Sequence, residues 1–271
     1  MRLFRRARQP VTLVIPARFG SSRFPGKPLA MLRGAEGARK PLIQWVWETA
    51  RRAQGIDRIL VATDDHWIAE SVRALGGEVV MTSPACRNGS ERCAEAVARA
   101  GIHQGIVVNL QGDAPLTPPA AIEALVRALA AGPDIAVASP MLRCGPAQVA
   151  RLVEAARRGT PGAVTVVVDR RGDALYFSRR VLPWFARDPG TAPVFRHLGV
   201  YAYRAQALAR YATTAPSDAE RLEELEQLRF LHIGMKIRMV EIAEPPGGLW
   251  EVNHPDDVPL VEAGLRVRDA P

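Results

Sequence analysis

Short apolar runs alternate with segments of helical periodicity along the first half of the chain. The runs Val11–Ile15 and Gly105–Leu110 are apolar at nearly every position, and between them Pro41–Ala53 repeats apolar residues at helical spacing. A strand without polar alternation is buried on both faces, and the helices that connect parallel strands are what cover it. The alternation therefore predicts an α/β fold with a mostly parallel sheet between two layers of helices.

The same pattern continues through most of the chain. We expect further strands at 58–63, 78–82, 135–139, 164–168 and 236–242, and helices at 66–75, 90–100, 118–131, 148–157, 218–231 and 255–267. Between Ala174 and Arg204 the β segments become shorter and prolines interrupt them, which indicates a smaller β-rich subdomain. The expected organisation is a disordered basic tail at 1–10, one domain at 11–262 that contains the subdomain at about 170–232, and a second tail at 263–271.

Composition excludes several classes of protein. The net charge is +8 and the pI is about 10.1, but arginine is scattered over the chain and aromatics are only 6%, so no nucleic-acid partner is expected. No run of about eighteen apolar residues could cross a membrane, and the arginine-rich start Met1–Gln9 leads into a strand, so we expect a cytoplasmic protein without membrane contact. Cys86, Cys93 and Cys144 are odd in number and lack C-x-x-C spacing, which argues against disulfides and zinc.

The loop after the first strand has the composition of a phosphate-binding loop. Arg18, Arg23 and Lys27 bring three cations within ten residues, and Gly20 and Ser21 leave the backbone amides open to an anion. The prolines at 25 and 28 fix φ on either side of the lysine and hold it in place. We therefore expect this loop to bind a phosphorylated small molecule.

Spacing excludes two common phosphate motifs. Five residues separate Gly20 from Gly26, where a P-loop has four, and Pro28 stands where that motif has Ser or Thr. The chain also lacks a G-x-G-x-x-G sequence after a strand. The loop is therefore neither of the Walker type nor of the dinucleotide-binding type.

Asp113 is the candidate metal ligand. It follows the strand Gly105–Leu110, and because the carboxyl ends of parallel strands meet at one edge of a sheet, it should lie beside the basic loop. A cationic loop beside a carboxylate suits a nucleoside triphosphate with Mg²⁺, since the cations neutralise phosphate oxygens and the carboxylate binds a hard metal. The alternative is an ordinary turn residue after Gly112.

The order of these motifs resembles that of the 3-deoxy-manno-octulosonate cytidylyltransferases, the sugar nucleotidyltransferases that activate the acid sugar Kdo with CTP. The resemblance runs from about residue 11 to about residue 260. It is carried by VIPAR at 14–18, SSRFPGKPL at 21–29, VATD at 61–64, GGEV at 76–79, MT at 81–82, GSER at 89–92, VNLQGD at 108–113, YFSR at 176–179, HLGVY at 197–201 and LEQLR at 225–229.

The resemblance implies a Rossmann-like, three-layer fold of the nucleotide-diphospho-sugar transferase type. It also implies Mg²⁺-dependent transfer of CMP from CTP to the anomeric 2-hydroxyl of Kdo, with release of pyrophosphate, by a homodimer joined through the proline-interrupted β segment and the helix at 218–231. The catalytic residues would be Arg18, Lys27 and Asp113. The nucleotide would bind to Pro16, Ala17, Arg18, Ser21, Arg23, Lys27, Gly89, Ser90, Arg92 and Gln111, the sugar to Arg179, His197, Tyr201, Glu226 and Gln227, and the metal to Asp113 and Asn253.

Two positions depart from the family pattern. The family usually has Glu where this chain has Ala114, and a metal-binding Asp where it has Asn253. An amide oxygen can bind Mg²⁺ but adds no charge, and Asp256 or Asp257 is better suited to a helix N-terminus. Three alternatives follow: a modified Kdo or another ulosonic acid as substrate, Kdo for capsule instead of lipopolysaccharide, or a non-catalytic nucleotide-binding protein. The motif blocks HLGVY at 197–201 and LEQLR at 225–229 favour Kdo over neuraminate.

Overall fold

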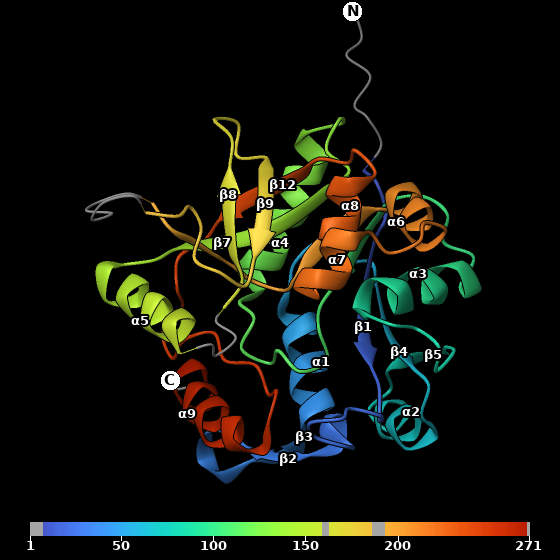
Figure 1. Cartoon of the computed structure of the whole chain (residues 1–271). Coiled ribbons are helices and arrows are strands. Elements are labelled where there is room, and N and C mark those ends of the chain that lie inside the picture. The colour runs from blue at the N-terminus through green and yellow to red at the C-terminus, as the bar shows by residue number, and fades with distance from the viewer. Residues whose placement is uncertain (1–7, 159–162, 186–192, 270–271) are drawn as a thin grey trace, which may run out of the picture.

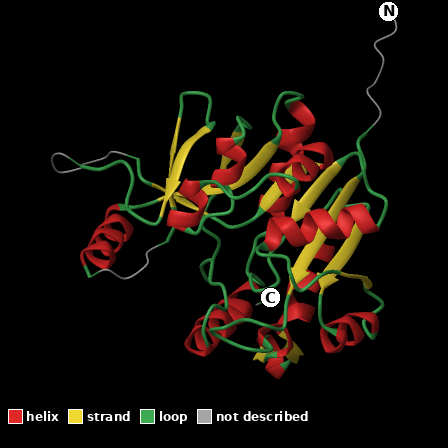
Figure 2. Cartoon of the chain, turned by 45° about the vertical axis from the view of Figure 1, so that its right-hand side comes forward, coloured by secondary structure: helices red, strands yellow, loops and turns green. Residues whose placement is uncertain are grey.

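The structure is a computed structural model that describes residues 8–158, 163–185 and 193–269. Its main sheet consists of β1 (Val11–Ala17), β4 (Arg58–Thr63), β5 (Glu78–Met81), β6 (Ile106–Asn109), β7 (Val137–Arg143), β8 (Thr165–Val168), β9 (Ala174–Ser178), β10 (Phe195–His197), β11 (Tyr201–Arg204) and β12 (Ile237–Glu241). The strand order is β5-β4-β1-β6-β11-β7-β10-β8-β9, and β12 pairs with β7. The sheet runs through the middle of the molecule with helices on either side (Figures 1 and 2).

The strands β5, β4, β1 and β6 form a parallel half. Val14 of β1 lies opposite Leu60 of β4 and Asn109 of β6. Past the end of the ladder, the Gly112 amide donates to the Pro16 carbonyl at 3.2 Å. The chain segments that follow β1 and β6 therefore leave the sheet side by side, as the sequence predicts.

The other half of the sheet is mixed in direction. β11 is antiparallel to both β6 and β7, so β7 regains the direction of β6, and β12 is parallel to β7. β10, β8 and β9 extend this side by antiparallel pairing. The predicted α/β class with a large, mostly parallel sheet is confirmed, and the β-rich segment forms one end of the same sheet. The limits of a subdomain at about 170–232 stay a prediction.

The helices lie close to their predicted positions. They are α1 (Leu42–Arg52), α2 (His66–Arg73), α3 (Gly89–Arg99), α4 (Pro119–Ala131), α5 (Pro146–Arg157), α6 (Ala205–Ala212), α7 (Asp218–Glu223), α8 (Leu228–His232) and α9 (Val258–Arg268), with 3-10 turns η1 (Lys27–Leu29), η2 (Ala35–Gly37) and η3 (Pro255–Asp257). Sequence patterns miss α6 and the hairpin of β2 (Met31–Arg33) and β3 (Arg39–Pro41). α9 continues into the expected tail at 263–271 because Leu265 is fully buried.

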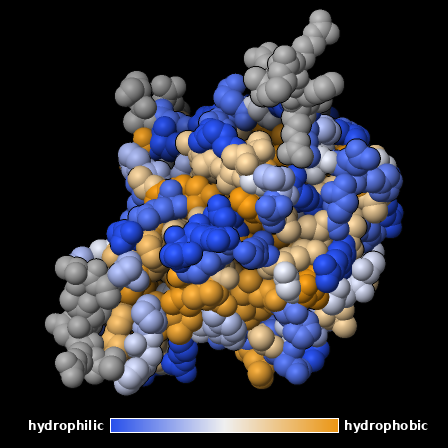
Figure 3. All heavy atoms as spheres, turned by 90° about the horizontal axis from the view of Figure 1, so that it is seen from above, coloured by the Kyte–Doolittle hydropathy of each residue, from blue (hydrophilic) through white to orange (hydrophobic). Residues whose placement is uncertain are grey.

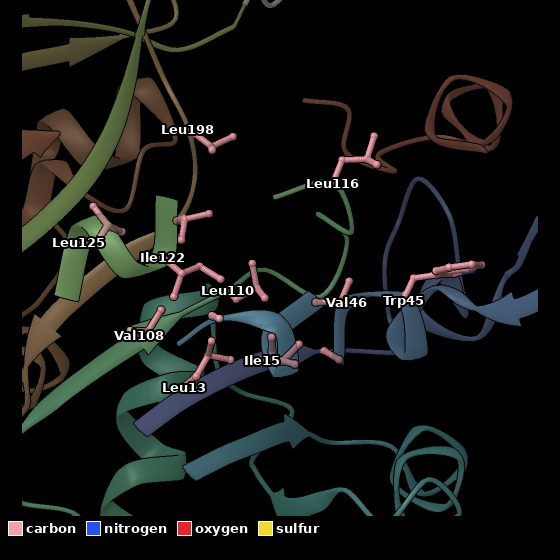
Figure 4. Packing of buried hydrophobic residues seen from close by; sticks show 14 of the residues in the cluster. Leu13, Ile15, Trp45, Val46, Val108, Leu110, Leu116, Ile122, Leu125 and Leu198 are labelled. Carbon is pink, nitrogen blue, oxygen red and sulfur yellow. The ribbon is translucent and has the colours of Figure 1, made fainter. Parts of the chain in front are cut away.

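Two hydrophobic clusters pack against opposite faces of the sheet. Leu13 and Ile15 of β1 belong to the cluster that includes side chains of α1, α4 and α9, whereas Val14 belongs to the cluster with side chains of α3, α6 and α8. Figure 4 shows the first of these, where Leu13, Ile15, Val108 and Leu110 meet residues of α1 and α4. Burial on both faces explains the continuous apolar runs that predicted these strands.

The single helix predicted over 218–231 is wrong, because the chain forms two short helices there. α7 ends at Glu223, and the next residue, Glu224, takes a left-handed conformation with φ of 54°. Arg229 at the start of α8 is completely buried and donates to Glu220 at 2.7 Å and to Glu91 of α3 at 3.0 Å. A continuous helix would not place residues 225–227 against the sheet, where Leu225 and Gln227 are buried.

Candidate active site

A polar cavity of about 170 Å³ lies where the segments after β1 and β6 meet the start of α3. Its lining consists of Pro16, Ala17, Arg18, Ser21, Arg23, Lys27, Pro28, Cys86, Arg87, Asn88, Gly89, Arg92, Gln111, Gly112 and Asp113. These include nine of the ten residues predicted to bind the nucleotide, and the predicted metal ligand Asp113. Segments far apart in the sequence thus meet at the edge of the sheet that the strand order predicts.

Lys27 and Asp113 form the central ion pair of this cavity. Lys27 Nζ lies 2.6 Å from Asp113 Oδ2, and the two side chains are 12% and 25% exposed. The loop is turned by Gly26, whose φ of 68° favours glycine, and its amide donates to the Phe19 carbonyl at 3.0 Å. The lysine is therefore held at a fixed place between the loop and the carboxylate. A shielded cation there is suited to a phosphate group.

The two loop arginines are more open. Arg18 and Arg23 are both exposed at the rim of the cavity, and Arg23 Nη2 lies 3.4 Å from Asn253 Oδ1. This contact brings the C-terminal segment to the phosphate loop across 230 positions of sequence. Both guanidinium groups can approach a phosphate chain from the solvent side.

The start of α3 and the segment after β6 form the opposite wall. The Asn88 side chain caps α3 by accepting from the Glu91 amide at 2.9 Å. A Cβ atom at Gly89 would lie 2.7 Å from Gln111 Nε2, so a side chain at this position would displace the Gln111 amide. Gln111 in turn donates to Asn109 Oδ1 at 2.9 Å. These contacts fix a narrow slot beside the helix N-terminus.

Arg92 is the one buried cation of this wall among the residues that line the cavity. Its guanidinium donates to Thr82 Oγ1 at 2.6 Å and to Asp64 Oδ2 at 3.0 Å, and only 3% of its side chain is exposed. Asp64 and Thr82 therefore position Arg92.

Ser90 does not line the cavity, although it was predicted to bind the nucleotide. Its side chain is fully buried and lies 2.7 Å from the Tyr203 hydroxyl, while its amide donates to Glu226 Oε2 at 2.9 Å. Glu226, which was predicted to bind the sugar, accepts from the first turn of α3 through Oε2, and its role toward the sugar stays a prediction. Burial raises the pKa of Glu226 to about 7.

Three of the predicted sugar-binding residues lie together: His197 of β10, Tyr201 of β11, and Gln227 just before α8. The Tyr201 hydroxyl donates to Gln227 Oε1 at 3.1 Å, and the rings of Tyr201 and His197 are 5.5 Å apart. Gln227 Nε2 is buried without a partner among the described residues. Tyr201 lies opposite Asn109 in the β6–β11 ladder, which places this group next to the nucleotide cavity.

His197 is held as a neutral ring. Burial lowers its pKa to about 3. Its Nε2 lies 2.7 Å from Ser139 Oγ, and the Ser139 hydroxyl donates to the Val200 carbonyl at 2.7 Å. Because that hydroxyl has one proton, Nε2 must be the donor to Ser139, and Nδ1 is the hydrogen-bond acceptor.

Arg179 lies at the end of β9 against α7. Its guanidinium donates to the carbonyls of Glu223 at 2.9 Å and Glu224 at 3.3 Å. The C-terminal carbonyls of α7 thus orient this cation. Arg179 is half-buried. Among the described residues it takes no part in the hydrogen bond between Tyr201 and Gln227.

The segment 251–253 runs beside Asp113. The Val252 amide donates to the Asp113 carbonyl at 3.0 Å, and Asn253 Oδ1 accepts from Arg23. Asp257 accepts from the amides of Asn253 and His254 at 2.8 and 2.7 Å, so it caps η3 as an N-terminal acid would. Sequence reasoning missed Glu251 in this segment, since no motif block includes it. Burial raises its pKa to about 7, the Asp113 charge adds to the shift, and Lys27 opposes it.

The available metal donors are hard oxygen atoms. Asp113 and Asn253 offer a carboxylate and an amide oxygen at the same edge, the ligand type that Mg²⁺ prefers. No group of three His, Cys, Asp or Glu side chains suited to a metal occurs in the described part of the chain. The donor set therefore fits a Mg²⁺ ion that takes its remaining ligands from phosphate and water. In the same part of the chain, no helix has the length and apolar composition that crossing a membrane requires.

Comparison with known proteins gives one family. The family model described as "Cytidylyltransferase" matches residues 12–237. A 3-deoxy-manno-octulosonate cytidylyltransferase of Maricaulis maris is 42% identical over 252 residues, which are 93% of this chain and 95% of that protein. An 8-amino-3,8-dideoxy-manno-octulosonate cytidylyltransferase of Shewanella woodyi is 42% identical over 259 residues, which are 95% of this chain and 99% of that protein.

A solved structure agrees with these relatives. CMP:2-keto-3-deoxy-manno-octonic acid synthetase in complex with CTP superposes with a TM-score of 0.80 at 36% identity, covering 94% of this chain and 98% of the other. The fold, the cavity at the sheet edge and the sequence relatives point the same way. The chain is a nucleotidyltransferase, and it belongs to the cytidylyltransferase family, among the 3-deoxy-manno-octulosonate cytidylyltransferases.

Proposed function

We propose that the protein transfers CMP from CTP to the anomeric 2-hydroxyl of Kdo, giving CMP-Kdo and pyrophosphate. The observation that carries this proposal is the position of the Lys27–Asp113 pair in a cavity that adjoins Tyr201 and its neighbours through the β6–β11 ladder. A triphosphate and an acid sugar can then meet at one edge of the sheet. The similarity to Kdo cytidylyltransferases over nearly the whole chain supports these two substrates.

The reaction needs positioning and charge stabilisation more than covalent chemistry. The sugar O2 forms a bond to the α-phosphorus and gives its hydroxyl proton to solvent, the bond from that phosphorus to the bridging oxygen breaks, and pyrophosphate leaves with the electron pair. Lys27, Arg18 and Arg23 are the cations that neutralise the leaving pyrophosphate. Ser21 lies among them in the same cavity as a hydrogen-bond donor to phosphate oxygen.

The cytosine and ribose fit the opposite wall. Pro16 and Ala17 offer backbone groups, and Gly89 permits the close approach of Gln111. Arg92, fixed by Thr82 and Asp64, adds a rigid donor. Ser90 would support this wall through its bond to Glu226 and would not contact the nucleotide with its side chain.

Mg²⁺ is the implied metal, and Asp113 and Asn253 are the residues that would hold it. When bound, it would neutralise charge on the triphosphate. Asp113 also keeps Lys27 in place, so this carboxylate has two tasks.

The polar groups around Tyr201 match an acid sugar. Neutral His197 offers Nδ1 as an acceptor for a hydroxyl, and buried Gln227 Nε2 offers an unused donor. Tyr201 links the two residues. Arg179 is the cation that suits the sugar carboxylate. Glu226 would act indirectly, by fixing the start of α3.

Pyrophosphate release tests this function. The purified protein is assayed with CTP, Mg²⁺ and a panel of Kdo, 8-amino-3,8-dideoxy-Kdo, other eight-carbon acids and neuraminate. We expect the highest kcat/KM with Kdo. A clear preference for the amino sugar would transfer the assignment to the activity named for the Shewanella woodyi relative. Binding of CTP without release for any acid would leave only the non-catalytic alternative.

A homodimer is part of the proposal, in the predicted cytosolic compartment where CTP is made. Hydrophobic residues are open to solvent at several places on the molecule, as on the face in Figure 3. Four large ones belong to the β-rich end and α7: Leu175 is 61% exposed, Tyr176 38%, Trp184 81% and Leu222 85%. Burial of such side chains between two copies would be favourable.

A further inference from the structure

We infer that Glu251 supplies the second carboxylate of the metal site, in place of the charge that Asn253 lacks. This inference rests on the proposed Mg²⁺-dependent use of CTP. Glu251 would bind the cation directly or through one water molecule, opposite Asp113. The site would then combine two carboxylates with the Asn253 amide oxygen, all of them hard donors.

The first argument is the placement of the segment. The Val252 amide is bonded to the Asp113 carbonyl at 3.0 Å, so the residue before it lies alongside Asp113. Asp257 fixes the other end of the segment through the Asn253 and His254 amides. Glu251 thus begins a short stretch whose next residues are anchored by hydrogen bonds, and its backbone lies beside that of Asp113.

The second argument is the balance of charge. Asp113 is already paired with Lys27 at 2.6 Å, so these two groups together are neutral toward a divalent cation. Asn253 adds a dipole only. Glu251 directly precedes Val252, whose amide is bonded to Asp113, so it is the next acid along this edge. Its ionised form would give the edge a net negative charge toward Mg²⁺.

The third argument is that Glu251 is not committed to a cation among the described residues. None of their ion pairs within 4.0 Å includes it, whereas Glu241 pairs with Arg143 and Asp257 caps η3. On its other side Glu251 lies near the backbone of Gly199, where a Cβ atom would be 3.9 Å from Glu251 Oε1. Its carboxylate accepts a hydrogen bond from the Asn253 side chain, and a half-buried carboxylate held by an amide alone is stabilised by a bound cation.

The test measures metal binding without turnover. Mn²⁺ replaces Mg²⁺, and its free concentration is followed by electron paramagnetic resonance in the presence of CTP and absence of sugar. We expect Glu251→Gln to raise the Mn²⁺ dissociation constant by about tenfold or more, within the range that metal-site partners usually contribute. The matched control Asp256→Asn removes one charge from an exposed neighbour and should leave the constant unchanged.

A second variant keeps the test decisive. Asn253→Asp places a carboxylate at the neighbouring oxygen position, so adding it to Glu251→Gln should restore most of the lost affinity. Thermal unfolding of each variant checks that the fold is intact. An Mn²⁺ affinity of Glu251→Gln equal to that of Asp256→Asn would overturn the inference, and a rise in the sugar KM alone would assign Glu251 to the sugar instead. Because no sugar is present in the binding experiment, its result is independent of whether Kdo is the substrate.

Discussion

Lys27 and Asp113 hold each other at the point where the phosphate loop meets the end of β6. Their separation of 2.6 Å in a partly shielded site means that each fixes the charge and place of the other. Asp113→Ala should therefore lower kcat by about a hundredfold or more, the size expected for loss of a preorganised charge in an active site. Pyrophosphate release measures the loss.

The same variant should keep its fold, because Asp113 is at the surface of the cavity and its carbonyl still accepts from Val252. Near-normal turnover of Asp113→Ala would refute the catalytic assignment. The control Asp65→Asn keeps a side-chain oxygen for the N-cap of α2 at a residue that does not line the cavity, and it should leave kcat as it is.

Glu226 gives a prediction about pH. Its pKa is raised from 4.5 to about 7 in the folded protein, so the folded state keeps a proton that the unfolded state loses between these values. Stability must then fall as pH rises through this window, by up to about 3 kcal/mol. Glu226→Gln cannot titrate and still accepts from the Ser90 amide, so its stability relative to the parent should improve from pH 5 to pH 8.

Urea unfolding at several pH values checks this effect. The exposed Glu70→Gln on α2 removes the same charge and serves as the control, with a pH profile parallel to that of the parent. If Glu226→Gln also runs parallel to the parent, the carboxylate is charged in the folded protein and the prediction is wrong.

At the scale of single residues, the sequence predicts which residues lie close together. It predicts the orientations of their side chains less well. The phosphate-loop cations and Asp113 line one cavity because strand order fixes where loops emerge. Ser90 faces away from that cavity, since the Asn88 cap and not Ser90 starts α3. Glu251 lies outside every motif, and only the Val252 bond to Asp113 reveals its position.

Among the elements, the break between α7 and α8 lowers the free energy of unfolding by a measurable amount. Glu224 adopts φ of 54°, where a side chain is unfavourable and glycine is not. Glu224→Gly should raise the free energy of unfolding by about 1 kcal/mol. Chemical denaturation measures the change, with Ala219→Gly inside α7 as a control that should lose about 1 kcal/mol. Equal losses in both variants would contradict the assignment of strain to Glu224.

This break could not be predicted from the local sequence. The stretch 218–231 has the charge pattern of one exposed helix, but Arg229 is buried because it pairs with Glu220 and with Glu91 of α3. Such a pairing depends on the tertiary fold. Strong local signals did predict the buried strands β1, β4 and β6 and the helices between them, since continuous apolar runs and helical spacing need no such information.

For the molecule as a whole, the proposed dimer makes the exposed hydrophobic residues of one end important. The double variant Leu175→Lys and Leu222→Lys should dissociate the dimer at micromolar concentrations, because it would place charges in an apolar contact. Light scattering after size-exclusion chromatography gives the mass. Trp67→Lys alters a side chain that is 68% exposed on α2 and should leave the mass unchanged. A monomeric parent protein would refute the dimer itself.

The sequence predicts the fold class of the sheet but not the order of its strands. Alternation of strands and helices predicts the parallel half, whereas the insertion of β11 between β6 and β7 requires a return across some ninety residues that no local pattern encodes. The hairpin β2–β3 escaped prediction because its strands are three residues each. Fold class therefore follows from periodicity, and sheet order follows from packing.

The insertion of β11 has a consequence for motion during catalysis. Tyr201 to Arg204 pair with Asn109 to Ile106 along the full length of β6, so the strand that carries Tyr201 and the strand that leads to Asp113 are parts of one hydrogen-bonded sheet. The two halves cannot hinge open and shut like the lobes of a kinase without breaking that ladder. With the proposed function, substrate and pyrophosphate would pass the exposed rim around Arg18 and Arg23 without a movement of the two halves of the sheet.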